Sequence, residues 1–200
     1  MTWDDDEDAI PADERIEEGL ARLVGIERLG SRLLQVPWFT HVGQPLLAGE
    51  RELARQYLDA LGFSDAELVP VQSWEEAAFA AENPGFDTAW WDTEEQLRAA
   101  LTGDALALLD QTELQIALTR LSDRAANGAK RGVREAAAMA SLDDDSLSNA
   151  AIGSAVQAAH QRALVLAAGA EAEHAFVPKF ALFEHGRWPI AVVGGTFHLF

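Results

Sequence analysis

The sequence predicts a mainly α protein of the α+β class, a helical bundle with a small antiparallel C-terminal β-hairpin or three-stranded sheet. Residues 92–175 contain no aromatic side chain in 84 positions, and 23 of these positions are alanine. This composition favours helices that pack closely through small side chains. The last 25 residues change instead to short β-rich runs bounded by glycine. All sixteen aromatic residues flank the alanine-rich stretch, so we expect the two flanks to share the bulky part of the core.

Six helices are predicted, because apolar residues recur in these segments at three- and four-residue spacing: 13–35, 48–61, 93–109, 112–126, 130–140 and 146–170. Pro37 ends the first helix. The second is expected to stop in a Schellman motif, with Gly62 left-handed and Phe63 folded back on the last turn. Asn127-Gly128 predicts a joint between the fourth and fifth helices.

Four short strands are predicted from β-rich runs: 68–71, 179–183, 188–193 and 196–200. Residues 184–187 are expected to form a hairpin turn, and Gly194-Gly195 a second turn. A lone hairpin is marginally stable in water, so we expect it to pack on helices or to pair with residues 68–71. Ser64, Ser73 and Thr93 each precede Glu or Gln by three residues, which matches the capping box of a helix start.

The net charge of −18 is concentrated near the N-terminus, where the first eighteen residues hold nine acidic side chains and one arginine. Such a run repels itself and buries nothing, so residues 1–12 are predicted to form a disordered acidic tail. Residues 13–200 are then one domain. The N-terminal segment does not resemble a signal peptide and no stretch is apolar enough to span a membrane, so the predicted location is cytoplasmic.

Composition excludes several classes of function. The chain has no cysteine, which excludes a disulfide framework, a thiolate zinc site, an iron–sulfur cluster and a cysteine nucleophile. The acidic balance argues against a nucleic-acid partner, because phosphate neutralisation needs clustered Lys and Arg. Neither the Gly-x-Ser-x-Gly elbow nor a glycine-rich phosphate loop occurs. No cofactor is predicted.

Two loops predict a small-molecule pocket, because each combines aromatic with polar side chains: Trp38, His41 and Gln44 in the first, and Asp87, Trp90, Trp91 and Asp92 in the second. His41 with Asp87 or Asp92 would form a general base and its orienting acid. The alternative is structural. Asp92 would then cap a helix, and the adjacent tryptophans would fill the seam between helices and sheet.

His160, Glu171 and His174 would share one face of the last long helix, with the Glu-x-x-His spacing of di-iron bundles. Such sites need a second pair and further carboxylates, which the sequence lacks, so the preferred interpretation is that no metal is bound. Arginines 120, 124, 131 and 134 form one basic cluster. We favour an ordinary solvated face over an anion site there.

Two classes of function remain open. The first is a non-enzymatic binding or regulatory protein that engages a protein partner or a small ligand, as a monomer or a homodimer. An acidic surface would steer a basic partner. The alternative is an enzyme that uses His41 with Asp87 or Asp92, or a metal-dependent bundle that uses His160, Glu171 and His174. The first is preferred, because each catalytic site lacks a necessary part.

Overall fold

The computed structural model describes residues 12–170 and 173–200. Within these ranges the helices are α1 (Ala12–Arg32), the 3-10 turn η1 (Leu33–Gln35), α2 (Ala48–Ala60), α3 (Trp74–Ala81), α4 (Thr88–Leu108), α5 (Gln111–Met139), α6 (Asp145–Ala167) and α7 (Phe176–Glu184). The strands are β1 (Glu67–Pro70), β2 (Pro189–Val193) and β3 (Thr196–Leu199). The predicted class, mainly α with a small sheet, is confirmed. The predicted tail lies outside the described residues except for Ala12, where α1 begins.

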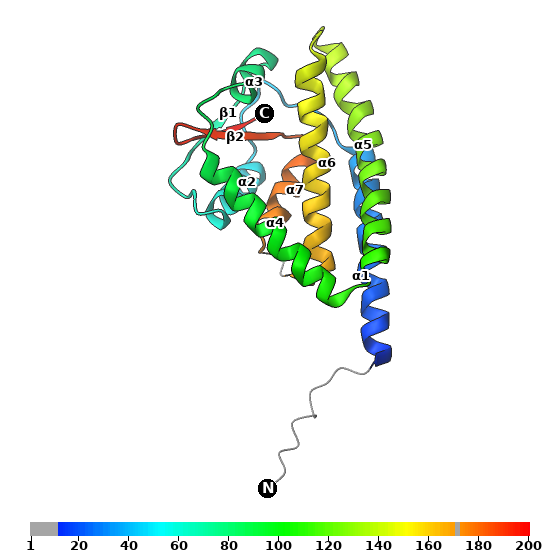
Figure 1. The fold of residues 1–200 in the computed structure, drawn as a ribbon. Helices are drawn as coiled ribbons and strands as arrows, with labels where there is room; N and C mark the ends of the chain where they lie inside the picture. The colour runs from blue at the N-terminus through cyan, green and yellow to red at the C-terminus, as the bar shows by residue number, and fades with distance from the viewer. Residues whose placement is uncertain (1–11, 171–172) are drawn as a thin grey trace.

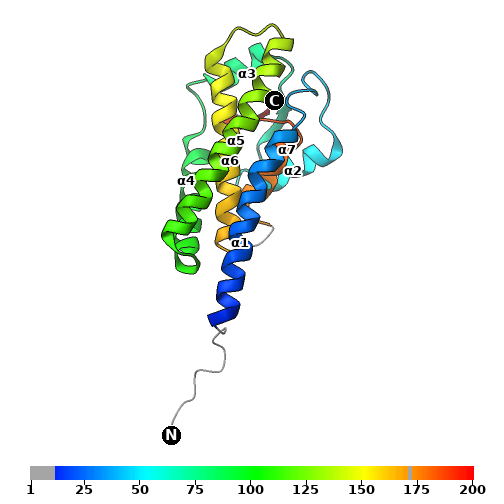
Figure 2. The same ribbon diagram turned by 90° about the vertical axis from the view of Figure 1, so that its right-hand side faces the viewer.

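Three long helices form one side of the molecule. In Figures 1 and 2, α1, α5 and α6 run side by side, and α6 lies between α5 and the remaining elements. Alanines 151, 155 and 159 of α6 are fully buried, as are Ala125 and Ala129 of α5. Close packing through small side chains, as predicted, therefore joins these helices.

The other side holds the sheet with α2, α3, α4 and α7 (Figure 1). The strand order is β1-β3-β2, so β3 is the central strand. β2 and β3 form the antiparallel hairpin, and β1 pairs with β3 in parallel. The sheet is therefore mixed, and the expected pairing with the segment near residue 68 is confirmed. Tyr57, Leu182 and Phe197 are fully buried in a hydrophobic cluster between α2, α7 and the sheet.

The segment 179–183, predicted as a strand, is helical and belongs to α7. Pro178 is tolerated there because it stands in the first turn of the helix. The predicted hairpin turn at 184–187 is the Schellman end of α7. Gly186 N–H donates to Phe183 O at 2.9 Å, and Arg187 N–H donates to Leu182 O at 3.0 Å. The hairpin turns instead at Gly194-Gly195, where φ is +56° and +82°.

The predicted joint at Asn127-Gly128 is also wrong, since α5 continues through it. Gly128 serves a close approach, because a Cβ there would lie 3.0 Å from the carbonyl oxygen of Leu33. The helix predicted from residue 93 begins at Thr88, with Asp87 as its N-cap, so Thr93 does not cap it. Ser73 does cap α3, whereas the segment after Ser64 leads into β1. The predicted stop at Gly62 is confirmed by Phe63 N–H donating to Leu58 O at 2.8 Å.

Candidate functional site

The two predicted loops lie in different surroundings. Trp38 is 5% exposed and packs on Phe183, with ring centroids 6.4 Å apart. Gln44 is exposed on the surface. His41 Nδ1 lies 3.7 Å from Glu50 Oε1, so the carboxylate beside this histidine comes from α2.

From the second loop, the structure places two tryptophans at a cavity. Asp87 caps α4 through an oxygen that accepts from Ala89 N–H at 2.9 Å, and its own N–H donates to Val192 O at 2.7 Å. These bonds fix the first turn of α4 beside β2, and with it Trp90 and Trp91. Asp92, on the same turn, is exposed and is not among the residues that line this cavity.

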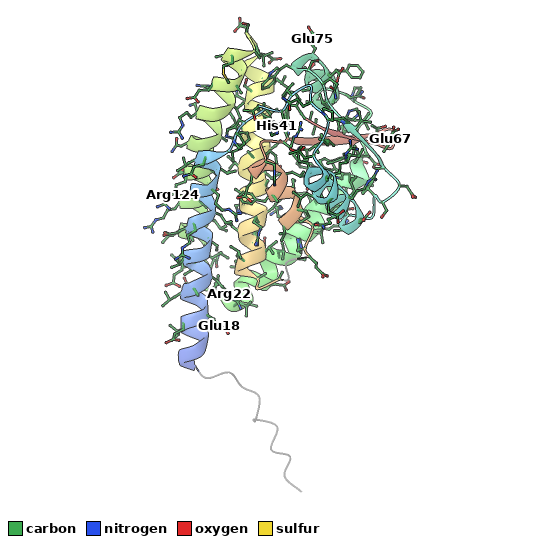
Figure 3. All side chains as sticks on the ribbon, turned by 180° about the vertical axis from the view of Figure 1, so that it is seen from behind. Glu18, Arg22, His41, Glu67, Glu75 and Arg124 are labelled. Carbon is green, nitrogen blue, oxygen red and sulfur yellow. The ribbon has the colours of Figure 1, made fainter. Side chains whose placement is uncertain are left out.

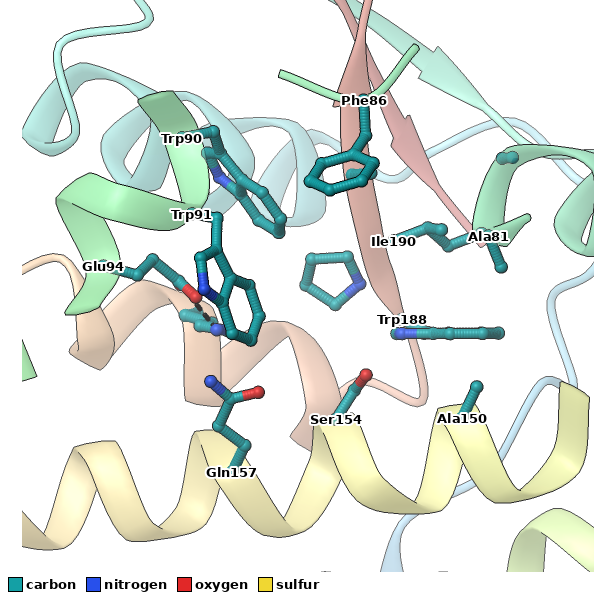
Figure 4. Close-up of a pocket in the computed structure, with 14 residues that line it drawn as sticks. Ala81, Phe86, Trp90, Trp91, Glu94, Ala150, Ser154, Gln157, Trp188 and Ile190 are labelled. Carbon is teal, nitrogen blue, oxygen red and sulfur yellow. Dashed lines mark hydrogen bonds and ion pairs between the residues drawn. The ribbon is translucent and has the colours of Figure 1, made fainter. Parts of the chain in front are cut away.

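The cavity has a volume of about 240 Å³ and lies between α3, α4, α6, α7 and β2 (Figure 4). Its lining is mainly apolar and aromatic: Ala80, Ala81, Phe86, Trp90, Trp91, Glu94, Ala150, Ser154, Gln157, Lys179, Trp188, Pro189, Ile190 and Ala191. Phe86 and Trp91 are each 45% exposed, so these two rings border the solvent. Aromatic walls with a few polar groups are typical of small-molecule sites.

One wall of the cavity holds a buried ion pair. Lys179 Nζ lies 2.5 Å from Glu94 Oε1. Tyr57 donates its hydroxyl hydrogen to the same oxygen, also at 2.5 Å. Lys179 and Glu94 are 4% and 1% exposed, and Tyr57 is fully buried. Lysine and glutamate are rarely buried this far unless paired, because desolvation of a charge is costly.

Burial sets the acid–base properties of this cluster. Burial lowers the pKa of Lys179 below its ordinary value of 10.5, although the Glu94 carboxylate opposes this. Burial and the nearby Glu94 raise the pKa of Tyr57 well above 10.0. The tyrosine therefore stays protonated as a donor, and the lysine gives up its proton more readily than a solvated lysine does.

Two buried polar atoms on residues of the lining have no hydrogen-bond partner in the described part of the chain: Glu94 Oε2 and Trp188 Nε1. Trp188 lies with its indole nitrogen toward the middle of the cavity, and Ser154 and Gln157 project toward it from α6 (Figure 4). An unsatisfied buried polar atom costs about 1–3 kcal/mol. The cavity therefore offers hydrogen-bonding capacity that the protein itself leaves unused.

A second buried ion pair lies between the loop 36–47, α2 and the α7–β2 joint. Glu50 Oε2 accepts from Arg187 Nη2 at 3.0 Å and from Leu47 N–H at 2.8 Å. Arg187 also donates to His41 O at 3.2 Å. Burial raises the pKa of Glu50, but the hydrogen bonds from Arg187 and Leu47 and the charges of Arg187 and His41 together lower it below its ordinary value, so this carboxyl remains ionised. The pair therefore connects the loop 36–47, α2 and the α7–β2 joint, and the backbone oxygen of His41 takes part in this connection.

His160 and His174 do not share a helix, because α6 ends at Ala167. His174 lies just before α7, where its Nδ1 accepts from Phe176 N–H at 3.2 Å. Glu171 lies outside the described residues. Over residues 12–170 and 173–200, no group of three His, Asp or Glu side chains is placed to hold a metal ion.

Three of the four arginines in the predicted basic cluster contact α1 or η1. Arg120 pairs with Glu27 at 3.2 Å, Arg124 donates to Glu27 O at 3.3 Å, and Arg131 donates to Leu34 O at 3.1 Å. Arg124 lies where α5 meets α1 (Figure 3). These arginines therefore dock the first helix on α5.

Comparison of the chain with models of known protein families, with curated protein sequences and with solved structures finds no match. Within the described ranges, no helix has the length and apolar character needed to cross a membrane.

Sequence reasoning missed four side chains of the cavity cluster: Tyr57, Glu94, Lys179 and Trp188. They come from four separate segments, with no shared spacing to connect them. One signal was present for Lys179, which stands inside the apolar run 175–183. If an apolar run is buried, a lysine within it is buried as well, and its charge then needs an acidic partner.

Proposed function

We propose that this protein binds a small ligand with one aromatic ring and a polar group, in the cavity between α3, α4, α6, α7 and β2. One observation carries the proposal. Aromatic walls, a buried lysine–glutamate pair and unpartnered polar atoms occur together at one cavity. Ligand sites combine these features, and perturbed titratable groups are enriched in them.

The volume sets the size of the ligand. Pockets for drug-sized molecules are roughly 300–1,000 Å³, and an apolar cavity of about 150 Å³ holds benzene. A cavity of about 240 Å³ therefore suits a single ring with a short substituent.

The polar groups set the chemistry of that substituent. A ligand hydroxyl would donate to Glu94 Oε2, and a ligand oxygen would accept from the indole N–H of Trp188. Lys179 and Glu94 neutralise one another, so the site favours a neutral ligand over a charged one.

Binding can be tested with the full chain and a set of one-ring aromatic alcohols, acids and amines, measured by saturation-transfer NMR. Neutral alcohols are expected to bind best. Ala150 is exposed and lines the cavity from α6 (Figure 4), so Ala150→Phe is expected to cover the cavity and abolish the signal. Ala138→Phe places the same side chain on an exposed position of α5 and is expected to leave binding unchanged.

Two results would contradict the proposal. One is the absence of binding by every compound in the set. The other is binding that Ala150→Phe leaves intact, which would locate the ligand elsewhere.

The other sequence-based interpretations stay predictions. These are a protein partner attracted by the acidic surface, a monomeric or dimeric state, and a cytoplasmic location. Catalysis by His41 with Asp87 or Asp92 has less support, since the carboxylate beside His41 belongs to Glu50.

A further inference from the structure

Lys179 differs sharply from the other lysine of this chain. The sequence contains only Lys130 and Lys179. Lys130 is exposed on α5, whereas Lys179 is 4% exposed and lines the cavity. Its Nζ lies 5.9 Å from the ring centroids of both Tyr57 and Phe176. A primary amine is thus held among aromatic rings at the wall of a ligand-sized space.

Stability alone gives little reason for a lysine at this position. A buried ion pair contributes about as much as well-packed apolar side chains of the same volume, and often less. Only one oxygen of Glu94 is paired, and the pair lies at a cavity wall rather than inside a sealed core. Lys179 and Glu94 both line the cavity, so the amine and its proton acceptor border a space of ligand size.

We propose that Lys179 forms an imine with an aromatic aldehyde that occupies this cavity, and this inference rests on the proposed function. Lysines in apolar pockets are the nucleophiles of Schiff-base chemistry. The rings of Trp90, Trp91 and Trp188 would hold the aromatic part of the ligand, with its carbonyl carbon against Nζ.

The residues present account for every proton in this reaction. Glu94 Oε1 takes one proton from the Lys179 ammonium, and the freed electron pair on Nζ attacks the carbonyl carbon. The C=O electron pair moves to oxygen, which takes the proton back from Glu94 and gives a carbinolamine. Glu94 then takes a second proton from nitrogen and passes it to the hydroxyl, which leaves as water while the nitrogen electron pair forms C=N. The third ammonium proton remains on the imine nitrogen. No oxidant or reductant is needed.

The surroundings make the neutral amine that this step requires easier to form than it is for a solvated lysine. Burial holds the pKa of Lys179 below its usual value. Tyr57 keeps its proton and donates to the Glu94 oxygen that accepts from the lysine. It therefore orients the carboxylate toward Nζ.

The two lysines provide an internal comparison in the unmodified protein. The full chain is incubated with benzaldehyde and sodium cyanoborohydride, which reduces C=N to a stable secondary amine. Chymotryptic peptides are then quantified by mass spectrometry. We expect benzylation of Lys179 to exceed that of Lys130 by at least about tenfold, because the cavity would hold the aldehyde beside Nζ and so raise its effective concentration there. In guanidinium chloride, which unfolds the chain, the two lysines should react alike. Modification of Lys130 with Lys179 spared in the native protein would overturn the proposal.

Two further measurements separate this inference from the proposed function. Benzyl alcohol has the shape of benzaldehyde but forms no imine. If benzyl alcohol binds but benzaldehyde with cyanoborohydride leaves Lys179 unmodified, the imine proposal is wrong and the proposed binding site stands. If neither compound binds, both proposals are wrong.

The variant Ala150→Phe is expected to protect Lys179 from benzaldehyde and to leave the reaction of Lys130 unaffected. If Lys179 is modified as much in this variant as in the unmodified protein, the adduct does not form through the cavity.

Discussion

Glu94 and Glu50 are fully or almost fully buried carboxylates, and each faces one cation that arrives from a distant segment. Lys179 reaches Glu94 across 85 residues of sequence, and Arg187 reaches Glu50 across 137. A buried charge without a partner is far more costly than a buried pair is favourable. These pairs therefore penalise any packing that brings the wrong segments together.

The Lys179–Glu94 pair gives a prediction for stability. Lys179→Met leaves the Glu94 carboxylate buried and unpaired, so we expect a loss of about 3–5 kcal/mol in the free energy of unfolding. The double variant with Glu94→Gln removes that charge while Tyr57 keeps an oxygen to donate to. It should recover most of the loss in denaturant titrations. A double variant no more stable than the single one would show that the charge was not the cause.

Single residues were also the hardest part of the site to predict. Trp90 and Trp91 were identified because they are adjacent and stand beside acidic residues. The sequence-based hypothesis pairs His41 with Asp87 or Asp92 because the two loops together resemble the parts of a pocket. The neighbour of His41 is Glu50, which lies nine residues further along the chain but on the facing end of α2. Tertiary packing decides which of several carboxylates lies beside a histidine, and the local sequence pattern does not carry that information.

At the scale of the elements, Gly132 of α5 allows the loop that follows η1 to approach this helix closely. A Cβ at Gly132 would lie 2.0 Å from Cδ1 of Trp38. Trp38 is 5% exposed and is held by Phe39 and Phe183. The indole therefore cannot move aside, and the absent Cβ lets the loop after η1 pack directly on the helix.

Two substitutions separate this packing role from helix propensity. Gly132→Ala should destabilise the protein, because overpacking costs about 1–3 kcal/mol or more and outweighs a propensity gain of about 1 kcal/mol. Gly153→Ala on α6 meets nothing within 4 Å, so it should stabilise by roughly 0.5–1 kcal/mol. Thermal unfolding of the two variants measures both effects. Equal shifts of the same sign would mean that Trp38 does not restrain α5.

Element types were predictable where one local signal dominated. The Schellman stop at Gly62 and the alanine-rich helices followed from propensity and spacing. α7 was mistaken for a strand, because Phe180, Leu182 and Phe183 have high or moderate strand preference. Their helical form is set by burial against two different clusters. Gly128 and Gly186 were each misjudged in the same way: the residue that suggested a break or a hairpin was needed for a close approach or a helix end.

For the whole molecule, the arrangement explains why aromatic residues occupy both flanks of the sequence. β3 lies between β1 and β2, so the sheet needs segments from both ends of the chain. Phe39 and Phe200 lie 4.9 Å apart between ring centroids, and Trp74 packs against both rings. The expected shared core of the two aromatic flanks is therefore present. This core is complete only when β3 has paired with its neighbours and Phe200 has packed against Phe39.

The behaviour toward acid is also a property of the whole chain. The histidines 160, 174 and 198 lie in different parts of the fold, and burial lowers the pKa of each below its ordinary value of 6.5. The charge of Arg98 lowers the pKa of His160 further, and that of Arg162 lowers the pKa of His174 further. The charge of Glu76 opposes the lowering of the pKa at His198. The unfolded chain therefore binds protons near pH 6.5 that the folded chain still excludes. Wherever the unfolded state binds more protons, the free energy of unfolding falls as the pH falls.

We therefore expect the protein to be less stable at about pH 5 than at about pH 7.5. Two effects act in the opposite direction. Burial raises the pKa of Glu184 despite its pairing with Arg32, which favours the folded state as that carboxyl is protonated. Acid also reduces the net charge of −18 and with it the self-repulsion of the compact state. Titration with guanidinium chloride screens that repulsion, because the denaturant is itself a salt, and so removes its effect from the comparison. His160→Gln should reduce the slope of stability against pH, and a protein equally stable at both pH values would contradict the expected exclusion of protons by the fold.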